Sequence, residues 1–253
     1  MHLPEIDRYA HLRTYLHSWD PRAKIASFSF LILSVVLLGK LPVALVGFAL
    51  ACAMVVSSRI PLRFILKQLR WVLLFVSVFF VLMPFFIPGR ELFGFHSLVI
   101  TQEGLYKATL IAVKALSIIL LIFPMIGTSP FPITIKALEG LRVPRVLVQI
   151  GAFAYRYIFL SIDEGKRMIT ALTSRGFERK NDLHTLKTLG TLIGMMFVRS
   201  YERTERVHQA MVSRGYDGNM VTLREFHLQW VDVGKAVFVS LLGALLISLE
   251  LTL

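Results

Sequence analysis

Two short motifs in this sequence carry the residue types best suited to binding an acidic partner. The order Ser-Arg-Gly followed by an aromatic residue occurs twice, and the second copy lies 39 residues after the first. The first copy is Ser174, Arg175, Gly176 and Phe177, and the second is Ser213, Arg214, Gly215 and Tyr216. An Arg guanidinium offers a rigid fork of hydrogen-bond donors that pairs bidentately with carboxylates. Two such tips would suit docking into acidic grooves on a dimeric partner.

The repetition extends upstream, which indicates that each motif ends a long helix. Each copy has an acidic residue four positions before an Arg, the favourable order on a helix, and then an Ala one turn later. These supporting positions are Asp163, Arg167 and Ala171 in the first copy and Glu202, Arg206 and Ala210 in the second. Between the copies, Asp182 is a candidate N-cap for the second helix.

Helix capping is the alternative explanation of the motifs. Gly takes the left-handed conformation that commonly ends a helix, and a cation in the last turn interacts favourably with the helix dipole. For a single copy this explanation would suffice. Capping does not require Ser, Ala and an aromatic residue at matched positions on two helices. The duplication therefore favours two helices that each present an Arg at the tip.

The rest of the chain, which must position these helices, has the composition of a membrane protein. Of its 253 residues, 55% are hydrophobic and 17% are charged, against roughly 45–50% and about 25% in soluble domains. This balance excludes a soluble enzyme of common type, and it excludes intrinsic disorder, because disordered chains contain too few apolar residues to collapse. The single Cys excludes a disulfide framework or a Cys-based zinc site. The sequence predicts an all-α, polytopic integral membrane protein.

Long apolar runs predict about five transmembrane helices in a chain of three parts. Residues 1–127 form an N-terminal membrane part with four spans, residues 128–229 a cytoplasmic region with the two long helices, and residues 230–253 the last transmembrane helix. The expected spans are residues 25–39, 43–57, 71–88, 105–127 and 233–251, with an outside loop at 89–104.

Three further segments are amphipathic or too short to be read simply as spans. The basic segment 59–70 predicts an amphipathic helix on the membrane surface, and a snorkelling extension of the third span is the alternative. Residues 146–162 and 186–198 are apolar but short or interrupted, where a span needs roughly 20 residues. We interpret both as partly buried helices, and a membrane span stays the alternative.

The distribution of charge predicts the orientation of the chain. The formal net charge is +12, from 28 Lys and Arg against 16 Asp and Glu. Most basic residues fall on the side of the bilayer that holds the N-terminus and residues 128–229, so the positive-inside rule places that side in the cytoplasm. The excess of positive charge therefore needs no nucleic-acid partner. We expect a multi-pass protein of the cytoplasmic (inner) membrane with its N-terminus in the cytoplasm.

The residues that catalysis would require are not found. No G-x-x-x-x-G-K-[ST] phosphate loop and no H-E-x-x-H zinc motif occurs, and the seven His are scattered. No cluster of acids or nucleophile with a base lies at membrane depth. We therefore expect no catalytic residue, no metal site and no cofactor, and we expect ATP to be hydrolysed by another protein. Lys114 lies well inside the fourth apolar run and is either functional or snorkels outward.

With these motifs in view, the chain resembles the T component of energy-coupling-factor transporters, in its cobalt or nickel (CbiQ-like) branch. The two Ser-Arg-Gly motifs match that family's two short Arg motifs residue by residue, and the likeness runs over most of the chain. The other matching stretches are residues 6–10 (IDRYA), 16–24 (LHSWDPRAK), 128–130 (TSP) and 137–144 (ALEGLRVP).

The resemblance implies a mechanical scaffold rather than a catalyst. In that family the two Arg motifs lie at the ends of crossed cytoplasmic coupling helices, and each binds one of two ABC-type ATPases. The scaffold joins them to a membrane subunit that binds the substrate. The resemblance implies a transition-metal cargo, cobalt or nickel, with a vitamin importer as the alternative. A self-contained carrier or channel is a further alternative, but it should show paired charges in several spans or inverted repeats across the membrane.

Overall fold

The structure is a computed structural model that describes residues 15–16, 18–88, 90–95, 98–218 and 228–252. The N-terminal stretch 6–10, part of the resemblance, lies outside these residues. The chain divides into two compact units, one of Met1–Arg142 with Phe226–Leu253 and one of Val143–Glu225. The main body of both units is helical, which confirms the predicted fold class.

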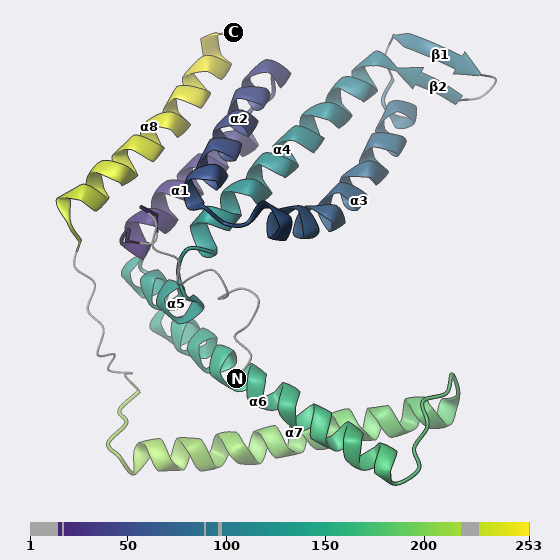
Figure 1. Cartoon of the computed structure of the whole chain (residues 1–253), viewed down its shortest axis with the longest axis vertical. Helices are drawn as coiled ribbons and strands as arrows, with labels where there is room; N and C mark the ends of the chain where they lie inside the picture. The colour runs from purple at the N-terminus through teal and green to yellow at the C-terminus, as the bar shows by residue number, and fades with distance from the viewer. Residues whose placement is uncertain (1–14, 17, 89, 96–97, 219–227, 253) are drawn as a thin grey trace. The chain divides into compact units, whose positions relative to one another are not determined.

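The first unit is a bundle of apolar helices (Figure 1). Its helices are α1 (Pro21–Leu37), α2 (Leu41–Ser58), α3 (Leu62–Phe86), α4 (Gln102–Ile126), α5 (Phe131–Gly140) and α8 (Trp230–Thr252). Helix α4 packs against α1, α2 and α3, and α8 packs along α1. The core lies between these helices and includes Phe28 and Leu31 of α1, Leu121 of α4 and Leu246 of α8, all fully buried.

One capping carboxylate and an early Pro define the start of the bundle. The Asp20 carboxylate accepts a hydrogen bond from Arg22 N at 2.8 Å, and Pro21 occupies the first helical position of α1. This combination of a capping carboxylate and an early Pro is a strong helix start. Only three residues separate α1 from α2, as expected for a tight helical hairpin.

A short β-hairpin stands where the sequence analysis expected only a loop at 89–104. Strands β1 (Glu91–Phe95) and β2 (Leu98–Thr101) pair antiparallel between α3 and α4. Thr101 fastens its base, because the hydroxyl donates to Ile87 O at 2.7 Å and accepts from Gly104 N at 3.3 Å. A Cβ at Gly104 would lie 2.6 Å from Pro84 Cα, so only Gly allows α4 to approach α3 this closely.

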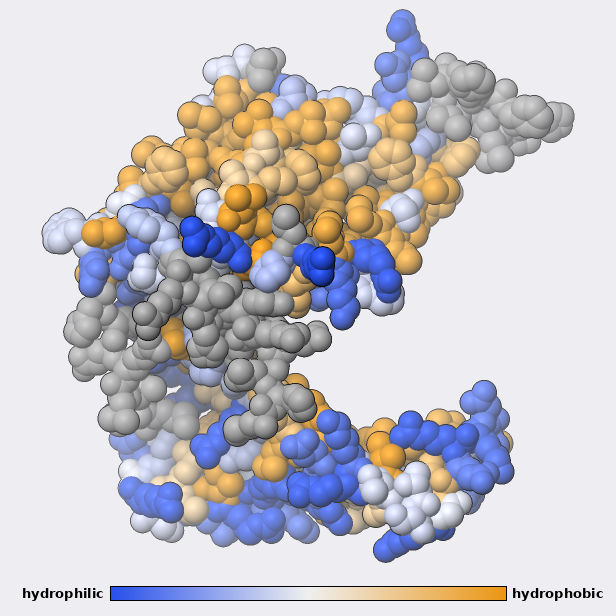
Figure 2. Space-filling view, in the orientation of Figure 1, coloured by the Kyte–Doolittle hydropathy of each residue, from blue (hydrophilic) through white to orange (hydrophobic). Residues whose placement is uncertain are grey.

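The sequence predicts five transmembrane helices, and the structure also contains five candidates, but only four helices belong to both sets. Five of the described helices are at least 18 residues long and apolar enough to cross a membrane: α2, α3, α4, α6 (Arg145–Ser174) and α8. Helix α1, the expected first span, has 17 residues and falls just short of that length. Figure 2 shows the apolar surface of the first unit, where hydrophobic side chains make up much of the visible face of the bundle. Exposed side chains such as Leu74 and Phe75 of α3 are suited to face lipid.

The basic segment 59–70 is not a separate helix. Arg59 ends α2 in a left-handed conformation with φ 53°, and α3 then begins at Leu62 and continues unbroken to Phe86. Arg63, Lys67 and Arg70 therefore lie in the first turns of a long apolar helix. This arrangement matches the alternative of a snorkelling extension of the third span.

The second unit contains two helices of 30 residues each, α6 and α7 (Leu183–Val212). They cross each other in Figure 1. The apolar stretches 146–162 and 186–198 are parts of these longer helices. Most side chains of 146–162 are half-buried, whereas most of 186–198 are exposed. Among the described residues of these two helices, only Val148 and Gly165 of α6 and Thr185 and Leu192 of α7 are buried.

Candidate functional site

The two Ser-Arg-Gly motifs end α6 and α7 with the same backbone geometry. Gly176 and Gly215 have φ values of 82° and 85°, in the left-handed region that favours Gly. In the first copy Gly176 N donates to Thr173 O and Phe177 N to Leu172 O, and in the second Gly215 N donates to Val212 O and Tyr216 N to Met211 O. This pair of hydrogen bonds is a Schellman motif, with the Arg as the last residue before the left-handed Gly. The duplication in sequence is therefore a duplication in structure.

The Ser side chains also have matching local roles. Ser174 Oγ donates to Thr170 O at 3.0 Å, and Ser213 Oγ donates to Gln209 O at 2.9 Å. Each hydroxyl thus bonds a carbonyl one turn earlier on its own helix. The Ser residues are satisfied within the helix and are not presented to a partner as free donors.

The two Arg side chains differ from the other motif residues because nothing in the described chain engages them. Arg175 and Arg214 are exposed, and neither guanidinium forms a hydrogen bond or ion pair with any described residue. Each stands at the C-terminal end of a helix, where exposed carbonyls favour a cation. Both tips therefore hold five donors each, available to carboxylates or carbonyls of another protein.

The supporting residues extend each tip into an exposed stripe. All six lie on the outside of their helices, and none is buried against the crossing. They are Asp163, Arg167 and Ala171 on α6 and Glu202, Arg206 and Ala210 on α7. Glu202 Oε2 lies 4.0 Å from Arg206 Nη1. Among the described residues, no ion pair joins Asp163 to Arg167. Neither stripe is used for packing inside the second unit, so both are available as surfaces.

The aromatic residues of the motifs face inward, which capping partly explains. Phe177 and Tyr216 are each half-buried at the position after Gly, where a Schellman motif commonly places an apolar contact with its own helix. Tyr216 also donates its hydroxyl to Gln149 Oε1 at 3.2 Å, and Gln149 Nε2 donates to Gly218 O at 2.9 Å. The end of α7 is thereby tied to the start of α6.

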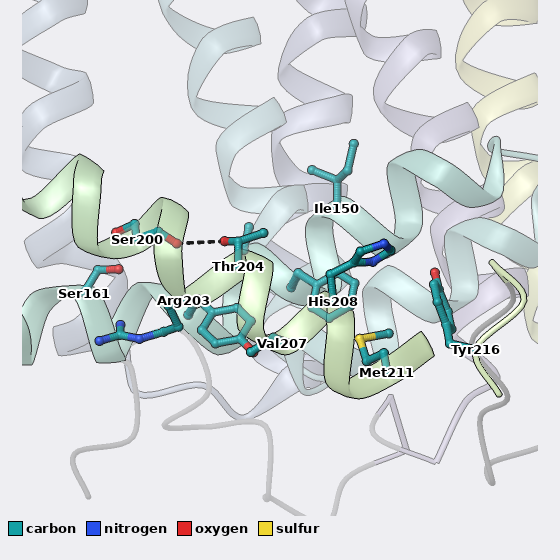
Figure 3. Close-up of a pocket in the computed structure, with 12 residues that line it drawn as sticks. Ile150, Ser161, Ser200, Arg203, Thr204, Val207, His208, Met211 and Tyr216 are labelled. Atoms are coloured by element: carbon teal, nitrogen blue, oxygen red, sulfur yellow. Dashed lines mark hydrogen bonds between the residues drawn. The ribbon is translucent and has the colours of Figure 1, made fainter. Parts of the chain in front are cut away.

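An apolar cavity of about 430 Å³ lies between α6 and α7 (Figure 3). Its walls include Phe153 and Tyr157 of α6 and Val207 and Met211 of α7, and Tyr216 closes one end. The few polar side chains around it come mainly from hydroxyl-bearing residues and from Arg203 and His208. The cavity separates the two helices between their crossing and their tie at Tyr216.

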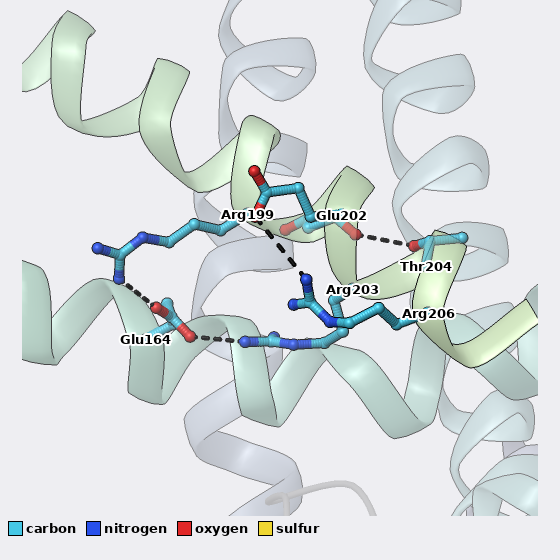
Figure 4. A network of polar contacts seen from close by, with 7 residues as sticks. Glu164, Arg199, Glu202, Arg203, Thr204 and Arg206 are labelled. Atoms are coloured by element: carbon cyan, nitrogen blue, oxygen red, sulfur yellow. Dashed lines mark hydrogen bonds and ion pairs between the residues drawn. The ribbon is translucent and has the colours of Figure 1, made fainter. Parts of the chain in front are cut away.

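At the crossing, one carboxylate holds two guanidinium groups (Figure 4). Glu164 Oε1 accepts from Arg199 Nη1 and Glu164 Oε2 accepts from Arg203 Nη2, both at 2.7 Å. These charge-assisted contacts join α6 to α7. Sequence reasoning missed them because it considered pairs within one helix, and Glu164 lies beside the repeated acid Asp163. Arg199 and Arg203 lie one turn apart, but spacing within one helix does not identify a partner on another helix.

The predicted N-cap of the second helix is confirmed. Asp182 Oδ1 accepts from Thr185 N at 2.8 Å. Hydrogen bonds from the side chain and backbone of Thr185 lower the pKa of Asp182. The cap is therefore intact at neutral pH, and its contribution is lost only as the pH falls through that lowered pKa.

Lys114 has a structural partner. Its Nζ donates to Leu38 O at 2.5 Å, at the C-terminal end of α1. A Lys that caps a helix end satisfies a carbonyl that has no partner within its own helix. Nearby, Glu250 accepts hydrogen bonds from Gly39 N and Lys40 N. Lys114 thus belongs to a polar cluster that fastens the α1–α2 turn to α4 and α8.

No group of three or more His, Cys, Asp or Glu that could hold a metal ion is present in the part of the chain that the structure describes. His17 and the other N-terminal His residues lie outside that part.

Comparison with known proteins gives a consistent set of relatives. The family model described as CbiQ, cobalt transport protein, matches residues 13–223. An uncharacterised protein of Methanocaldococcus jannaschii is 26% identical, with 96% of this chain and 86% of that protein covered. The energy-coupling factor transporter transmembrane protein EcfT of Staphylococcus aureus is 29% identical, with 89% of this chain and 88% of that protein covered. EcfT of Brevibacillus brevis is also 29% identical, with 96% of each chain covered.

Proposed function

This chain belongs to the CbiQ family of cobalt transport proteins, and we propose that it couples two ABC-type ATPases to a membrane subunit that binds the substrate. It is a multi-pass transmembrane component of an energy-coupling factor transporter, and it is a non-catalytic subunit. The proposal concerns its partners, its cargo and the residues that transmit motion.

The observation that carries the proposal is the pair of identical helix ends with unengaged Arg side chains. Arg175 and Arg214 stand on matching Schellman ends, and each follows an exposed stripe on a 30-residue helix. Two equal surfaces on one chain suit two equal copies of a partner. The family's Arg motifs support ATPases as that partner, with one subunit on each tip.

The mechanism follows from the stiffness of the two helices. Closure of two ATPase subunits on ATP would move the tips on which they sit. A helix of 30 residues transmits such a displacement along its length because its backbone hydrogen bonds resist bending. The crossed pair would thus convert closure into a movement relayed to the membrane part and to the substrate-binding subunit.

The proposed cargo is a transition-metal ion, cobalt or nickel. The description of the family model supports cobalt, whereas the printed names of the EcfT relatives specify no substrate. The same scaffold role in a vitamin importer is the alternative cargo assignment. Selectivity would reside in the substrate-binding subunit, so uptake of labelled Co²⁺, Ni²⁺ and vitamins by cells that carry the complete transporter distinguishes these cargoes.

We also propose the orientation and the division of the chain. The N-terminus and residues 128–229 would face the cytoplasm, residues 1–127 would form the membrane part, and residues 230–253 the last span. The distribution of Lys and Arg supports this orientation.

The functional test is uptake by variants of the two tips. Arg175→Glu and Arg214→Glu should each weaken transport, because a carboxylate would repel an acidic docking site. Loss of a charge pair at an interface typically costs about 2 kcal/mol or more, roughly a 30-fold loss of affinity. Arg179→Glu, an exposed position outside both motifs, is the control. Normal uptake by the double variant, with all proteins inserted at equal levels, would refute the proposed role of the tips.

A further inference from the structure

Apolar packing contributes little to the crossing of α6 and α7. Gly165 is buried at the crossing, and a Cβ there would lie 3.4 Å from Met196 Cε. Leu192 is the one large apolar side chain of α7 that is buried. A crossing with so small an apolar contact does not by itself fix the angle between two helices, because ridges and grooves must interlock over several turns to do so.

Glu164 supplies a more specific contact at this point. Both of its carboxylate oxygens are used, one by Arg199 and one by Arg203, at 2.7 Å each. The Glu164 side chain is only 16% exposed, and that of Arg203 is 28% exposed. Partial burial reduces screening by solvent for the Arg203 pair, whereas the Arg199 side chain is 49% exposed and its pair with Glu164 is more strongly screened. Two Arg from successive turns of α7 fix the rotation of that helix as well as its distance from α6.

The same contact also balances charge on α7. Arg199 and Arg203 are one helical turn apart, and like charges at this spacing repel each other. The Glu164 carboxylate lies between them and offsets this repulsion (Figure 4). Without it, two cations would face α6 beside the apolar cavity, and that side of the crossing would open.

We propose that Glu164 is a positioning residue that joins α6 to α7 at their crossing, and thereby sets one crossing angle and one separation of the Arg175 and Arg214 tips in the chain without bound ATPases. The role of Glu164 at the crossing does not depend on the proposed function. Its consequence for transport rests on the proposed function, because the two helices can pass movement of the tips to the membrane part together only if they stay joined at the crossing. Glu164 itself contacts no cargo and no ATPase in this mechanism.

The first test measures the angle directly in the full-length chain, reconstituted in lipid nanodiscs without partners. Spin labels at Thr173→Cys and Val212→Cys, both near the tips and outside the crossing, report the distance between the helix ends after Cys52→Ala removes the native thiol. We expect a single narrow distance distribution. Glu164→Gln, which keeps the shape and removes the charge, should lose that narrow population and give a broad one.

Two variants control this measurement. Glu205→Gln removes an exposed carboxylate of α7 outside the contact and should leave the distribution narrow. The charge swap Glu164→Lys with Arg199→Glu and Arg203→Glu rebuilds the pairs in reverse and should restore a narrow distribution. A narrow distribution in Glu164→Gln would overturn the proposal, and so would a swap that inserts normally but stays broad. If Glu164→Gln fails to fold, the swap alone decides between these outcomes.

The second test separates this inference from the proposed function. In the complete reconstituted transporter, Glu164→Gln should lower the amount of cargo transported per ATP hydrolysed, and the swap should restore it. An unchanged ratio would contradict the positioning role. If the wild-type chain captures no ATPase at all, the proposed function fails, whereas the spin-label result still shows whether Glu164 fixes the crossing.

Discussion

At the scale of single residues, three of the four residues in each motif have a role within their own helix end, and the Arg has none. The Gly supplies the left-handed turn, the Ser bonds its own helix, and the aromatic residue packs inward after the turn. Sequence reasoning predicted the Gly role correctly, but it did not assign the aromatic residue to the cap. Only the Arg175 and Arg214 side chains form no hydrogen bond or ion pair within the described chain, which supports the proposal that they bind a partner.

Replacement of the motif Gly by Ala should destabilise its helix end, whereas the same replacement within a helix should stabilise the helix. Gly176→Ala places a Cβ in open space but in a left-handed conformation with φ 82°, which costs about 1 kcal/mol. We expect faster hydrogen–deuterium exchange at the end of α6. Gly190→Ala is the matched control, because Gly190 lies in open space within α7, where Ala stabilises a helix by about 0.5–1 kcal/mol. Equal effects of the two variants would contradict the assigned backbone geometry.

Lys114→Met tests the structural role of that Lys. The change removes the donor to Leu38 O and leaves a partly buried carbonyl without its partner. Such a loss costs about 1–3 kcal/mol, so thermal unfolding in detergent should occur at a lower temperature. Transport per ATP by the folded fraction should be unchanged. A normal melting temperature with impaired transport would instead favour the functional interpretation of Lys114.

At the scale of helices, the sequence predicts what depends on neighbours along the chain. The start of α7 at Asp182 and the helix ends at both motifs follow from residues within a few positions. The contact of Glu164 with Arg199 and Arg203 depends on how two helices cross, and spacing within one helix contains no such information. The basic segment 59–70 was ambiguous for a related reason, because the same charge pattern suits a surface helix and the first turns of a span.

Lys24 links α1 to the connection between α4 and α5. Its side chain is fully buried, and Nζ donates to Thr128 Oγ1 at 2.8 Å and Ser129 Oγ at 2.5 Å. The ammonium lies near the C-terminal end of α4, where the helix dipole favours a cation. Lys24 therefore fixes the position from which the chain enters α5.

Lys24→Ala should lower the stability of the first unit more than Lys24→Met. The Ala variant leaves both a cavity and two hydroxyls without their donor, and core truncations of this kind cost about 2–5 kcal/mol. Met fills most of the volume, and replacement of a buried charge by an apolar group is often tolerated. Thermal unfolding of the two variants in the same detergent gives the comparison. An Ala variant as stable as Met would show that the Lys24 side chain has no packing role.

At the scale of the whole molecule, the composition and the positive-inside rule lead to one topology. The excess of Lys and Arg in residues 128–229 supports it, and four of its five spans, α2, α3, α4 and α8, are long and apolar enough to cross a membrane. The sequence left residues 146–162 as either a partly buried helix or a span, and in the structure they are part of the 30-residue helix α6, which is long and apolar enough to cross a membrane. Length and hydropathy therefore do not separate the proposed coupling helix α6 from a membrane helix in this chain.

Labelling of single Cys residues tests the topology. In a Cys52→Ala background, Arg90→Cys beside the hairpin should react with an impermeant thiol reagent added to intact cells. Asn181→Cys, between α6 and α7, should react only after the membrane is opened. Both positions are exposed, so access depends on the side of the membrane. Reaction of Asn181→Cys in intact cells would reverse the proposed orientation.

The most direct test of the central claim is capture of the host's ABC-type ATPases in mild detergent. The wild-type chain and the Arg179→Glu control should capture two ATPase subunits per chain. The Arg175→Glu, Arg214→Glu double variant should lose that capture while it still inserts into the membrane. Equal capture by the double variant would contradict the assignment of the two helix ends as docking sites. If none of the three proteins captured an ATPase, coupling to ATPases would itself be refuted.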